Sequence, residues 1–134
     1  MRKYQELVDT AKELLRGRYE KEGHHSVVAA ALRTKSGKVY KALNTGTYQP
    51  SIATCAEIIA IGMAHTAEEN MEIDSIVAVR DEATYIISPC GKCREYIFDY
   101  GPEAIVLMPD ENGGFIPTLI KDLLPGKYHK CGCE

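Results

Sequence analysis

Three cysteines in two short motifs constrain the fold of this chain more than any other feature. The motifs read Cys55-x-Glu57 and Pro89-Cys90-x-x-Cys93. Three thiols from separate segments meet at one point when a metal ion holds them, and three are one ligand short of a closed tetrahedral zinc site. Glu57 lies close enough to the first thiol to move a proton of water in the open position. The motifs therefore predict a fold that brings both segments to one catalytic metal centre.

Both motifs fall where the sequence predicts the start of a helix. Pro89 suits the entry to a helix, so Cys90 would lie in its first turn and Cys93 on the same face. Cys55 occupies the same kind of position at the start of an earlier helix. The first backbone N–H groups of a helix lack partners and carry partial positive charge, which helps to ionise thiols. Two helix N-termini are thus expected to face one metal ion.

Other interpretations of the cysteines stay open. A free cysteine is often only a small buried apolar residue. Cys90 and Cys93 alone could form a redox pair, and a structural zinc site could take Cys131 or Cys133 as its fourth ligand. Glu57 argues against a structural site, which would not require a carboxylate there, although a helix-capping role would also explain this residue.

The composition is that of one ordinary globular domain. The chain has 134 residues, and this length suits a single domain over residues 1–134 whose tail, 129–134, can be disordered. A net charge of −3 provides no basic surface for nucleic acid, so a small molecule is the expected partner. We expect no membrane span and no signal peptide. Three of the five cysteines have metal-type spacing, which favours a reducing compartment, the cytoplasm.

Apolar periodicity and turn residues predict alternating helices and strands. We expect helices at 3–20, 55–69 and 90–100 and a short helix that ends at 125–126. We expect strands at 27–32, 38–43, 73–79, 84–87, 104–108 and 115–118. The first two strands should form a hairpin, with the first central in the sheet and the second nearer its edge. Because helices alternate with strands, the predicted fold class is α/β, a three-layer α/β/α sandwich around a mixed five-stranded sheet.

Local signals set the expected limits of two helices. The first helix should end near Gly17 or Gly23. Thr54 should cap the helix at 55–69, and Glu57 three residues later would complete a capping box. That helix is apolar nearly all round its axis, so we expect it to be buried.

The two cysteine motifs together resemble a known signature. A ligand-x-Glu segment followed by Pro-Cys-x-x-Cys, in its three-cysteine version, is the pattern of the zinc nucleobase deaminases. Over about residues 24–128 the chain resembles the cytidine deaminase family, and most closely its blasticidin S deaminase branch. Segments 29–32 and 123–125 also look like family landmarks. The resemblance implies an α/β/α sandwich, cytidine deaminase-like, that assembles as a homotetramer in which neighbouring subunits contribute to each site.

The resemblance also implies the chemistry. It assigns Cys55, Cys90 and Cys93 as ligands of Zn²⁺ and Glu57 as the proton shuttle. Zinc lowers the pKa of a coordinated water from about 15.7 toward about 7, so hydroxide is available at neutral pH. Glu57 would then carry a proton to the ring nitrogen and to the departing amine. The expected reaction is hydrolytic deamination of the cytosine ring of a small nucleoside-like substrate, giving the uracil form and ammonia.

Substrate contacts follow from the resemblance position by position. The backbone around Ala56 and Ser88 matches the part of the family that receives the exocyclic amine and the ring edge. Asn44 matches an asparagine that hydrogen-bonds a sugar hydroxyl, although a turn residue would look the same. Ser26 stands where many relatives have a phenylalanine that stacks on the base. Tyr128 matches a tyrosine of a C-terminal segment that closes over the substrate, although it could simply pack on the surface.

Departures from the family pattern bear on the substrate. Gly46 stands where ordinary cytidine deaminases have a glutamate that grips the ribose, and a lost buried acceptor discriminates strongly between substrates. Ile58 replaces an arginine that neutralises the thiolates, so Arg94 and Lys92 are the candidates for charge compensation. Blasticidin S is therefore the favoured substrate and cytidine or deoxycytidine the second choice. Another amino-heterocycle, such as a purine or pterin, and a non-catalytic zinc-binding interaction domain stay as alternatives.

Overall fold

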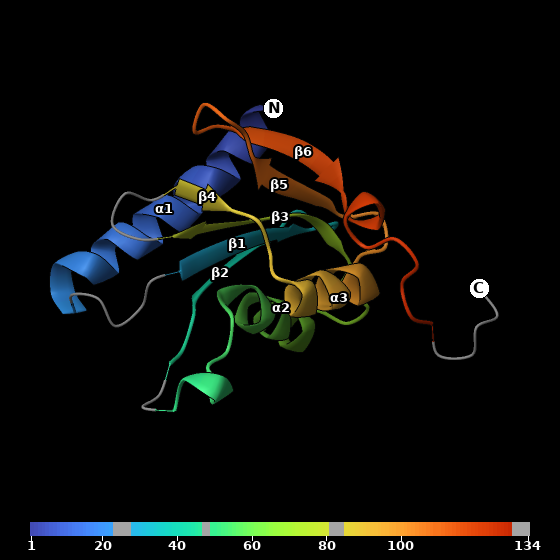
Figure 1. Cartoon of the computed structure of the whole chain (residues 1–134), viewed down its shortest axis with the longest axis horizontal. Coiled ribbons are helices and arrows are strands. Elements are labelled where there is room, and N and C mark those ends of the chain that lie inside the picture. Colours follow the sequence, from blue (N-terminus) through green and yellow to red (C-terminus); the bar gives the residue numbers. More distant parts are fainter. Residues whose placement is uncertain (23–27, 47–48, 81–84, 130–134) are drawn as a thin grey trace.

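The structure, a computed structural model, describes residues 1–22, 28–46, 49–80 and 85–129 (Figure 1). The helices are α1 (Arg2–Glu22), α2 (Ala56–Ala67) and α3 (Gly91–Tyr100), with two short 3-10 helices, η1 (Pro50–Ile52) and η2 (Ile120–Leu123). The strands are β1 (Val28–Thr34), β2 (Val39–Leu43), β3 (Ile73–Arg80), β4 (Tyr85–Ile87), β5 (Ile105–Pro109) and β6 (Phe115–Leu119). Helices and strands therefore alternate over most of the chain, as the periodicity predicts.

The strands form one mixed sheet. Five of them follow the order β2-β1-β3-β5-β6, and the three-residue β4 pairs with the end of β3 outside that path. The β3–β5 pair is parallel, whereas the other pairs are antiparallel. The predicted hairpin is confirmed, with β1 inside the sheet and β2 at its edge. The short β4 makes the sheet six-stranded and joins the core to the second cysteine motif.

Helices cover both faces of the sheet, so the predicted three-layer α/β/α sandwich is confirmed (Figure 1). On one face, α1 packs four buried apolar residues onto β1, β3 and β5, namely Leu7, Val8, Ala11 and Leu15. On the other face, α2 and α3 bury Ala60, Ile61, Ala64 and Ile97. The i, i+3, i+4 spacing of the apolar residues in α1 is what gives this helix a single buried stripe.

Helix α1 ends at Glu22, the residue before Gly23, so the second of the two predicted ends, near Gly17 or near Gly23, is confirmed. The helix runs through Gly17 without interruption. Glycine costs about 1 kcal/mol relative to alanine inside a helix, which is less than the packing of the buried stripe provides. Polar residues occupy its outer face, and among the described residues there is no helix with the length and apolar character needed to cross a bilayer.

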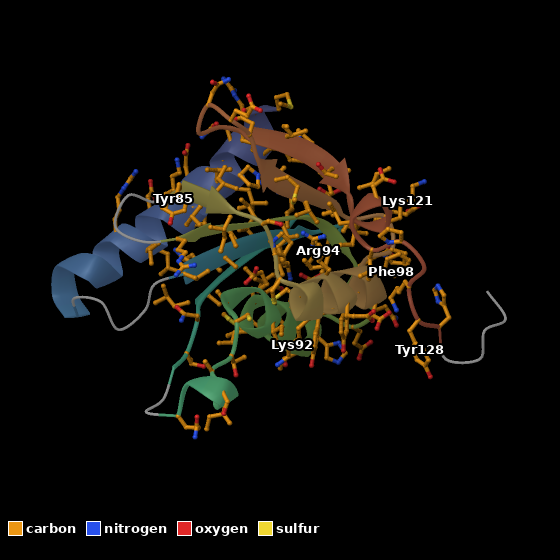
Figure 2. All side chains as sticks on the ribbon, in the orientation of Figure 1. Tyr85, Lys92, Arg94, Phe98, Lys121 and Tyr128 are labelled. Carbon is orange, nitrogen blue, oxygen red and sulfur yellow. The ribbon has the colours of Figure 1, made fainter. Side chains whose placement is uncertain are left out.

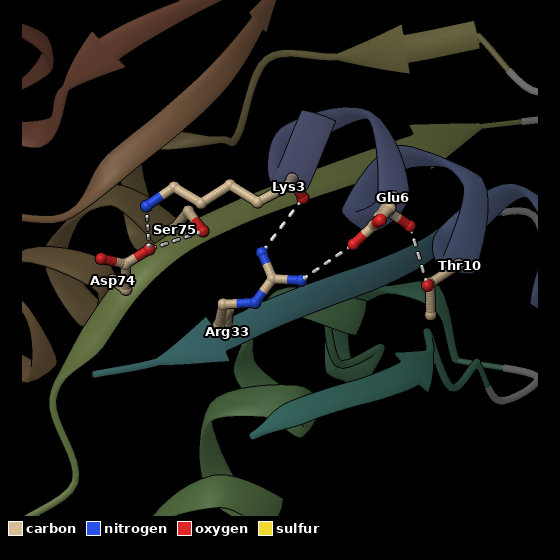
Figure 3. A network of polar contacts seen from close by, with 6 residues as sticks. All are labelled: Lys3, Glu6, Thr10, Arg33, Asp74 and Ser75. Atoms are coloured by element: carbon tan, nitrogen blue, oxygen red, sulfur yellow. Dashed lines mark hydrogen bonds and ion pairs between the residues drawn. The ribbon is translucent and has the colours of Figure 1, made fainter. Parts of the chain in front are cut away.

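Polar contacts fasten the first turns of α1 to the sheet (Figure 3). The Arg33 guanidinium donates a hydrogen bond to the carbonyl oxygen of Lys3 over 3.0 Å and lies 4.0 Å from the Glu6 carboxylate. The Lys3 amine lies 3.6 Å from the carboxylate of Asp74, which also accepts a hydrogen bond from the Ser75 hydroxyl. These contacts connect α1 to β1 and β3 at the end of the sheet where β3 begins.

Two expectations about α2 are wrong. Its N-cap is Cys55, and no side-chain hydrogen bond caps the helix, so the predicted capping box with Thr54 does not form. Thr54 instead pairs through its backbone with Thr45 in an isolated β-bridge. The helix is also not buried all round, because Met63 is 46% exposed. Its outer apolar face is left open in a single chain.

Candidate metal centre and substrate pocket

The three cysteines of the two motifs converge in the structure. Cys55 is the N-cap of α2, Cys90 is the N-cap of α3, and Cys93 lies in the first turn of α3. Their sulfur atoms all lie within 4.8 Å of one another, and the Sγ atoms of Cys55 and Cys90 are 4.0 Å apart. The predicted meeting of two helix N-termini is thus what the fold provides.

The local backbone explains why thiols sit at these positions. Both N-cap residues have extended backbone, with φ −67° and ψ 146° at Cys55 and φ −69° and ψ 170° at Cys90. Each carbonyl oxygen accepts the first helical hydrogen bond, from the N–H groups of Ile59 and Arg94 respectively. The N–H groups of the first turns have no helical acceptors and point toward the thiols. Anionic sulfur is favoured at both helix ends for this reason.

The three thiols differ in their exposure to solvent. Cys93 is buried, Cys55 is half-buried and Cys90 is exposed. Desolvation raises the pKa of the Cys93 and Cys55 thiols, because burial disfavours the thiolate. Desolvation acts in the same direction on Cys90, but the backbone N–H groups of Cys93 and Lys92 and the two neighbouring thiols outweigh it, so the pKa of Cys90 is lowered. A bound cation would offset the free-energy cost of burying such thiolates.

The donor set fits zinc. Sulfur atoms bound tetrahedrally at the usual Zn–S length of about 2.3 Å would be about 3.8 Å apart, close to the Cys55–Cys90 separation. The described residues place no fourth cysteine, histidine or carboxylate ligand in this cluster. Cys131 and Cys133, the alternative fourth ligands, lie outside the described residues. Three thiol ligands leave the fourth coordination position for water or substrate, which is the arrangement of a catalytic zinc site.

Glu57 is the carboxylate beside the three thiols, and its role as the proton shuttle stays a prediction. It lies in the first turn of α2 and is only 4% exposed. Burial raises the pKa of its carboxyl group, and hydrogen bonds from its own backbone N–H and from the Cys93 thiol offset part of that rise. A carboxyl group with a raised pKa takes up and releases a proton nearer neutral pH than an exposed glutamate does, which suits acid–base chemistry.

A pocket of about 290 Å³ opens onto the cysteines and Glu57. Six of the residues singled out in the sequence line it, namely Asn44, Cys55, Ala56, Glu57, Ser88 and Cys90. They come from the end of β2, the start of α2 and the loop between β4 and α3. The fold therefore gathers two of the three thiols, the Glu57 carboxylate and candidate substrate contacts around one small cavity.

Asn44 is held in a fixed orientation at the rim of this pocket. Its backbone N–H donates to the carbonyl oxygen of Val28 over 3.0 Å, and its side-chain oxygen accepts a hydrogen bond from the Val28 N–H over 3.0 Å. These two bonds extend the β1–β2 pairing by one step. The oxygen of Asn44 is thus engaged with Val28, and the hydrogen-bond donors of its side chain are those of the amide NH₂.

Arg94 fixes the loop that carries Cys90. Its guanidinium donates to the Ser88 hydroxyl over 2.8 Å, to the carbonyl oxygen of Pro89 over 2.9 Å and to that of Leu123 over 3.0 Å. Figure 2 shows its side chain on the side of α3 that faces the sheet. These bonds make Arg94 a positioning residue for the second motif, and its role in charge compensation stays a prediction.

The structure does not bring Tyr128 to the pocket of its own chain. Its side chain is 75% exposed, and Figure 2 shows it on the C-terminal segment beyond α3. The neighbouring Lys127 holds this segment against α3 through the carboxylates of Asp99, at 2.9 Å, and Glu95, at 3.3 Å. Ser26 lies outside the described residues. The expected contact between Tyr128 and substrate is therefore not formed within one chain.

Several residues that line the pocket were not predicted from the sequence. Arg80 is the most important of them, because no other described residue that lines the pocket has a cationic side chain. Thr54, expected to be a cap, also lines the pocket, as do Val28 and Ile87. The signal for Arg80 was its place at the end of an apolar strand, two residues after Ala78, which puts both side chains on one face of the sheet.

Fold and site together define the class of protein. Residues 1–108 match the family described as the cytidine and deoxycytidylate deaminase zinc-binding region. The chain belongs to this family, and the expectation of a zinc-dependent deaminase is confirmed. The match includes all three cysteines and Glu57.

Individual relatives indicate which branch of this family the chain resembles. The blasticidin-S deaminase of Bacillus cereus is 42% identical over 130 residues, which cover 92% of this chain and 90% of that protein. A probable cytidine deaminase of Dictyostelium discoideum is 30% identical over 104 residues, which cover 78% of this chain and 69% of that protein. Both alignments support the predicted resemblance, and the first supports its branch.

Solved structures support the same fold. The cytidine deaminase of Bacillus anthracis is 27% identical and aligns with a TM-score of 0.79 over 92% of this chain and 88% of that one. The cytidine deaminase of Mycobacterium tuberculosis is 21% identical, with a TM-score of 0.76 over 95% of this chain and 98% of that one. At the lower identity the likeness concerns the fold alone.

Proposed function

We propose that this protein hydrolyses the amino group from the cytosine ring of blasticidin S or a similar nucleoside-like molecule. The observation that carries the proposal is the buried Glu57 in a pocket shared with Cys55 and Cys90. The relative at 42% identity is a blasticidin-S deaminase and the probable cytidine deaminase is 30% identical, which favours blasticidin S over cytidine as the substrate. Cytidine and deoxycytidine are the second choice.

The chain's own residues account for the steps of this reaction. Cys55, Cys90 and Cys93 would hold the zinc, which when bound supplies a Lewis acid that makes water nucleophilic at neutral pH. Water adds to the ring carbon that bears the amino group, and Glu57 accepts the proton that the water loses. Glu57 passes this proton to the ring nitrogen, then takes the remaining proton of the added water and delivers it to the amine as the carbon–nitrogen bond breaks. Ammonia leaves, and the oxygen stays on the ring as a carbonyl group.

The site favours a substrate that is not bound through the hydroxyl groups of a ribose. Gly46, which replaces the ribose-binding glutamate of ordinary cytidine deaminases, is exposed and does not line the pocket. Glu57 is the single carboxylate among the described lining residues, and it faces the thiols. An alternative is deamination of another amino-heterocycle, and a non-catalytic zinc-binding domain is the alternative of a different class.

Replacement of Glu57 by glutamine separates these possibilities. Glu57→Gln should keep zinc and melting temperature but lower kcat by about 10²–10⁴-fold, the usual contribution of a positioned acid–base group. Glu69→Gln, the same change at an exposed position after α2, is the matched control and should leave kcat unchanged. A Glu57→Gln protein with the same kcat as the parent would contradict the proposed function.

An ultraviolet assay of the zinc-loaded protein tests the substrate class. The panel comprises blasticidin S, cytidine, deoxycytidine, cytosine and guanine, and loss of the amino group from a cytosine ring changes its absorbance. We expect blasticidin S to have the highest kcat/KM. Turnover of cytidine and deoxycytidine alone would show that the weight placed on Gly46 was wrong.

The proposed assembly is a homotetramer. Its support is the open apolar face of α2, where Ile59 and Met63 meet Tyr40 around a shallow groove. An exposed Tyr128 could then contact the pocket of a neighbouring subunit rather than its own. Sedimentation velocity should give a tetramer that Met63→Glu dissociates, and a monomeric parent protein would contradict this. A cytoplasmic location also stays a prediction, supported by the three free thiols.

A further inference from the structure

Arg94 holds one wall of the pocket from outside the cavity. Ser88 lines the pocket in the loop between β4 and α3, two residues before Cys90. The half-buried Arg94 donates two hydrogen bonds to this loop, to the Ser88 hydroxyl over 2.8 Å and to the carbonyl oxygen of Pro89 over 2.9 Å. Its third bond goes to the carbonyl oxygen of Leu123 in η2 over 3.0 Å. One guanidinium therefore connects the pocket wall to α3 and to η2.

The two bonds to the loop lie on either side of one peptide group. The Ser88 carbonyl belongs to the peptide bond between Ser88 and Pro89, so the Ser88 hydroxyl comes before it and the Pro89 carbonyl after it. A residue that precedes proline is also restricted to extended conformations, which narrows the directions that its carbonyl can take. Arg94 and the proline ring together thus fix the orientation of the Ser88 carbonyl.

The Ser88 carbonyl is an open hydrogen-bond acceptor in the pocket wall. Across the described residues, the protein donates no hydrogen bond to its oxygen. By contrast, the carbonyl oxygens of Cys55 and Cys90 accept the first bonds of α2 and α3. An acceptor that is covered without a partner costs free energy, so a ligand that fills the pocket is expected to supply a donor to Ser88.

The proposed reaction provides this donor in the substrate and removes it in the product. The reacting ring carbon lies between the thiols and Glu57, so its amino group lies close to the segment that ends in Cys90. An amino group on the ring donates through its N–H bonds, whereas the carbonyl oxygen that replaces it only accepts. A fixed acceptor at this position therefore favours the substrate over the product.

Resting on the proposed function, these contacts lead to a role for Arg94. We propose that Arg94 is a positioning residue for the discrimination between substrate and product, because it holds the Ser88 carbonyl toward the amino group of the substrate. In the described part of the chain, no hydrogen bond joins the Arg94 guanidinium to a cysteine sulfur. Arg94 acts on the pocket wall in this arrangement and takes no part in proton transfer.

Pairs of ligands that differ only in the reacting group test the proposal. Cytidine and uridine form one pair, and blasticidin S and its deaminated product form the other. Zinc-loaded protein with Glu57→Gln should bind all four without turnover, and calorimetry gives each dissociation constant. The amine of each pair should bind more tightly than its product. In this background, Ser88→Ala and Arg94→Gln should each lower that preference by about three- to tenfold, the scale of one hydrogen bond between neutral groups.

Three further variants separate positioning from general damage. Ser88→Thr keeps a hydroxyl that can accept from Arg94 and should retain the preference. Ser51→Ala, the same change at an exposed serine of η1 that does not line the pocket, should leave the preference unchanged. The double variant Ser88→Ala, Arg94→Gln should lose no more than the larger single effect, because two residues in one contact are coupled. Additive losses would show that Arg94 acts independently of Ser88 and would contradict the proposal.

Two other results would overturn it. One is an unchanged preference in both Ser88→Ala and Arg94→Gln, and the other is an equal loss of affinity for the amine and for its product. If Arg94→Gln loses zinc, Ser88→Ala alone decides the outcome. If the parent protein deaminates no cytosine compound the proposed function fails, whereas a preference for the amine that Ser88→Ala lowers would still support the role of this contact. A protein that binds neither pair would contradict both.

Discussion

The two faces of the sheet are built for different tasks. On the α1 face, long apolar side chains such as Leu7, Leu15 and Leu107 are fully buried and fill the space between helix and sheet. On the opposite face, near the cysteines, the contact between α2 and the sheet is made by three alanines, Ala30, Ala56 and Ala78. Small residues let the start of α2 approach the strands and leave room beside them for the pocket.

The two regions contribute differently, because the α1 face mainly stabilises the fold and the alanine contact positions the metal site. Close-packed interiors resist changes of volume, so the α1 face should determine much of the stability of the domain. The alanine contact buries little surface, but it fixes the position of the α2 N-terminus and thereby of Cys55 and Glu57. Substitutions on the α1 face are expected to change unfolding, and equal substitutions at the three-alanine contact beside the cysteines are expected to change catalysis as well.

The largest effect should come from Leu15→Ala. Leu15 is fully buried between α1 and the sheet, and its truncation should lower the free energy of unfolding by about 2–5 kcal/mol. Urea denaturation measures this value, and zinc content and kcat/KM of the folded protein should stay at the parent level. Leu14→Ala, at a partly buried neighbouring position, should have a smaller effect. Lost zinc in folded Leu15→Ala would show that the two faces are coupled.

A matched pair of alanine substitutions sharpens the comparison. Ala78→Val adds two carbons to the contact with Ala56 and should move the start of α2, so kcat/KM should fall while overpacking costs about 1–3 kcal/mol. Ala29→Val makes the same change on the α1 face and should cost a similar amount of stability with kcat/KM retained. Equal activity losses in both variants would contradict the division of tasks.

The smallest effect should come from the polar contacts at the start of α1. Arg33→Met removes the hydrogen bond to the Lys3 carbonyl and the contact with Glu6, both largely on the surface. Exposed pairs of this kind contribute up to about 1 kcal/mol, so a small drop in melting temperature with unchanged activity is expected. Lys3→Met tests the ion pair with Asp74 in the same way. A loss above that scale would mean that α1 depends on its first turn for docking.

Much of this organisation could be predicted from the sequence, because the signals are local. Apolar periodicity located the helices and strands, and the spacing of the cysteines placed them at two helix starts. The structure added what depends on distant segments. Thr54 pairs with Thr45 instead of capping α2, and α1 continues through Gly17, because long-range pairing and packing outweigh local preference.

The substrate side of the site was harder to predict for the same reason. The local pattern places Arg80 on one face of β3, but its place beside Val28 in the pocket depends on the register of β3 with β1, which that pattern does not specify. Tyr128 is directed away from the pocket by Lys127, whose partners on α3 are about thirty residues earlier in the chain. Metal ligands that share a short motif can be predicted from a sequence. A pocket wall formed by several strands can be predicted only once the pairing of those strands is known.

The coordination of zinc tests the central claim most directly. X-ray absorption at the zinc edge should be recorded for the parent protein and for the double variant Cys131→Ser, Cys133→Ser. A catalytic site held by Cys55, Cys90 and Cys93 predicts three sulfur ligands and one lighter ligand in both proteins, with equal zinc content. Four sulfur ligands in the parent protein, or zinc lost from the double variant, would mean a closed structural site and contradict the account.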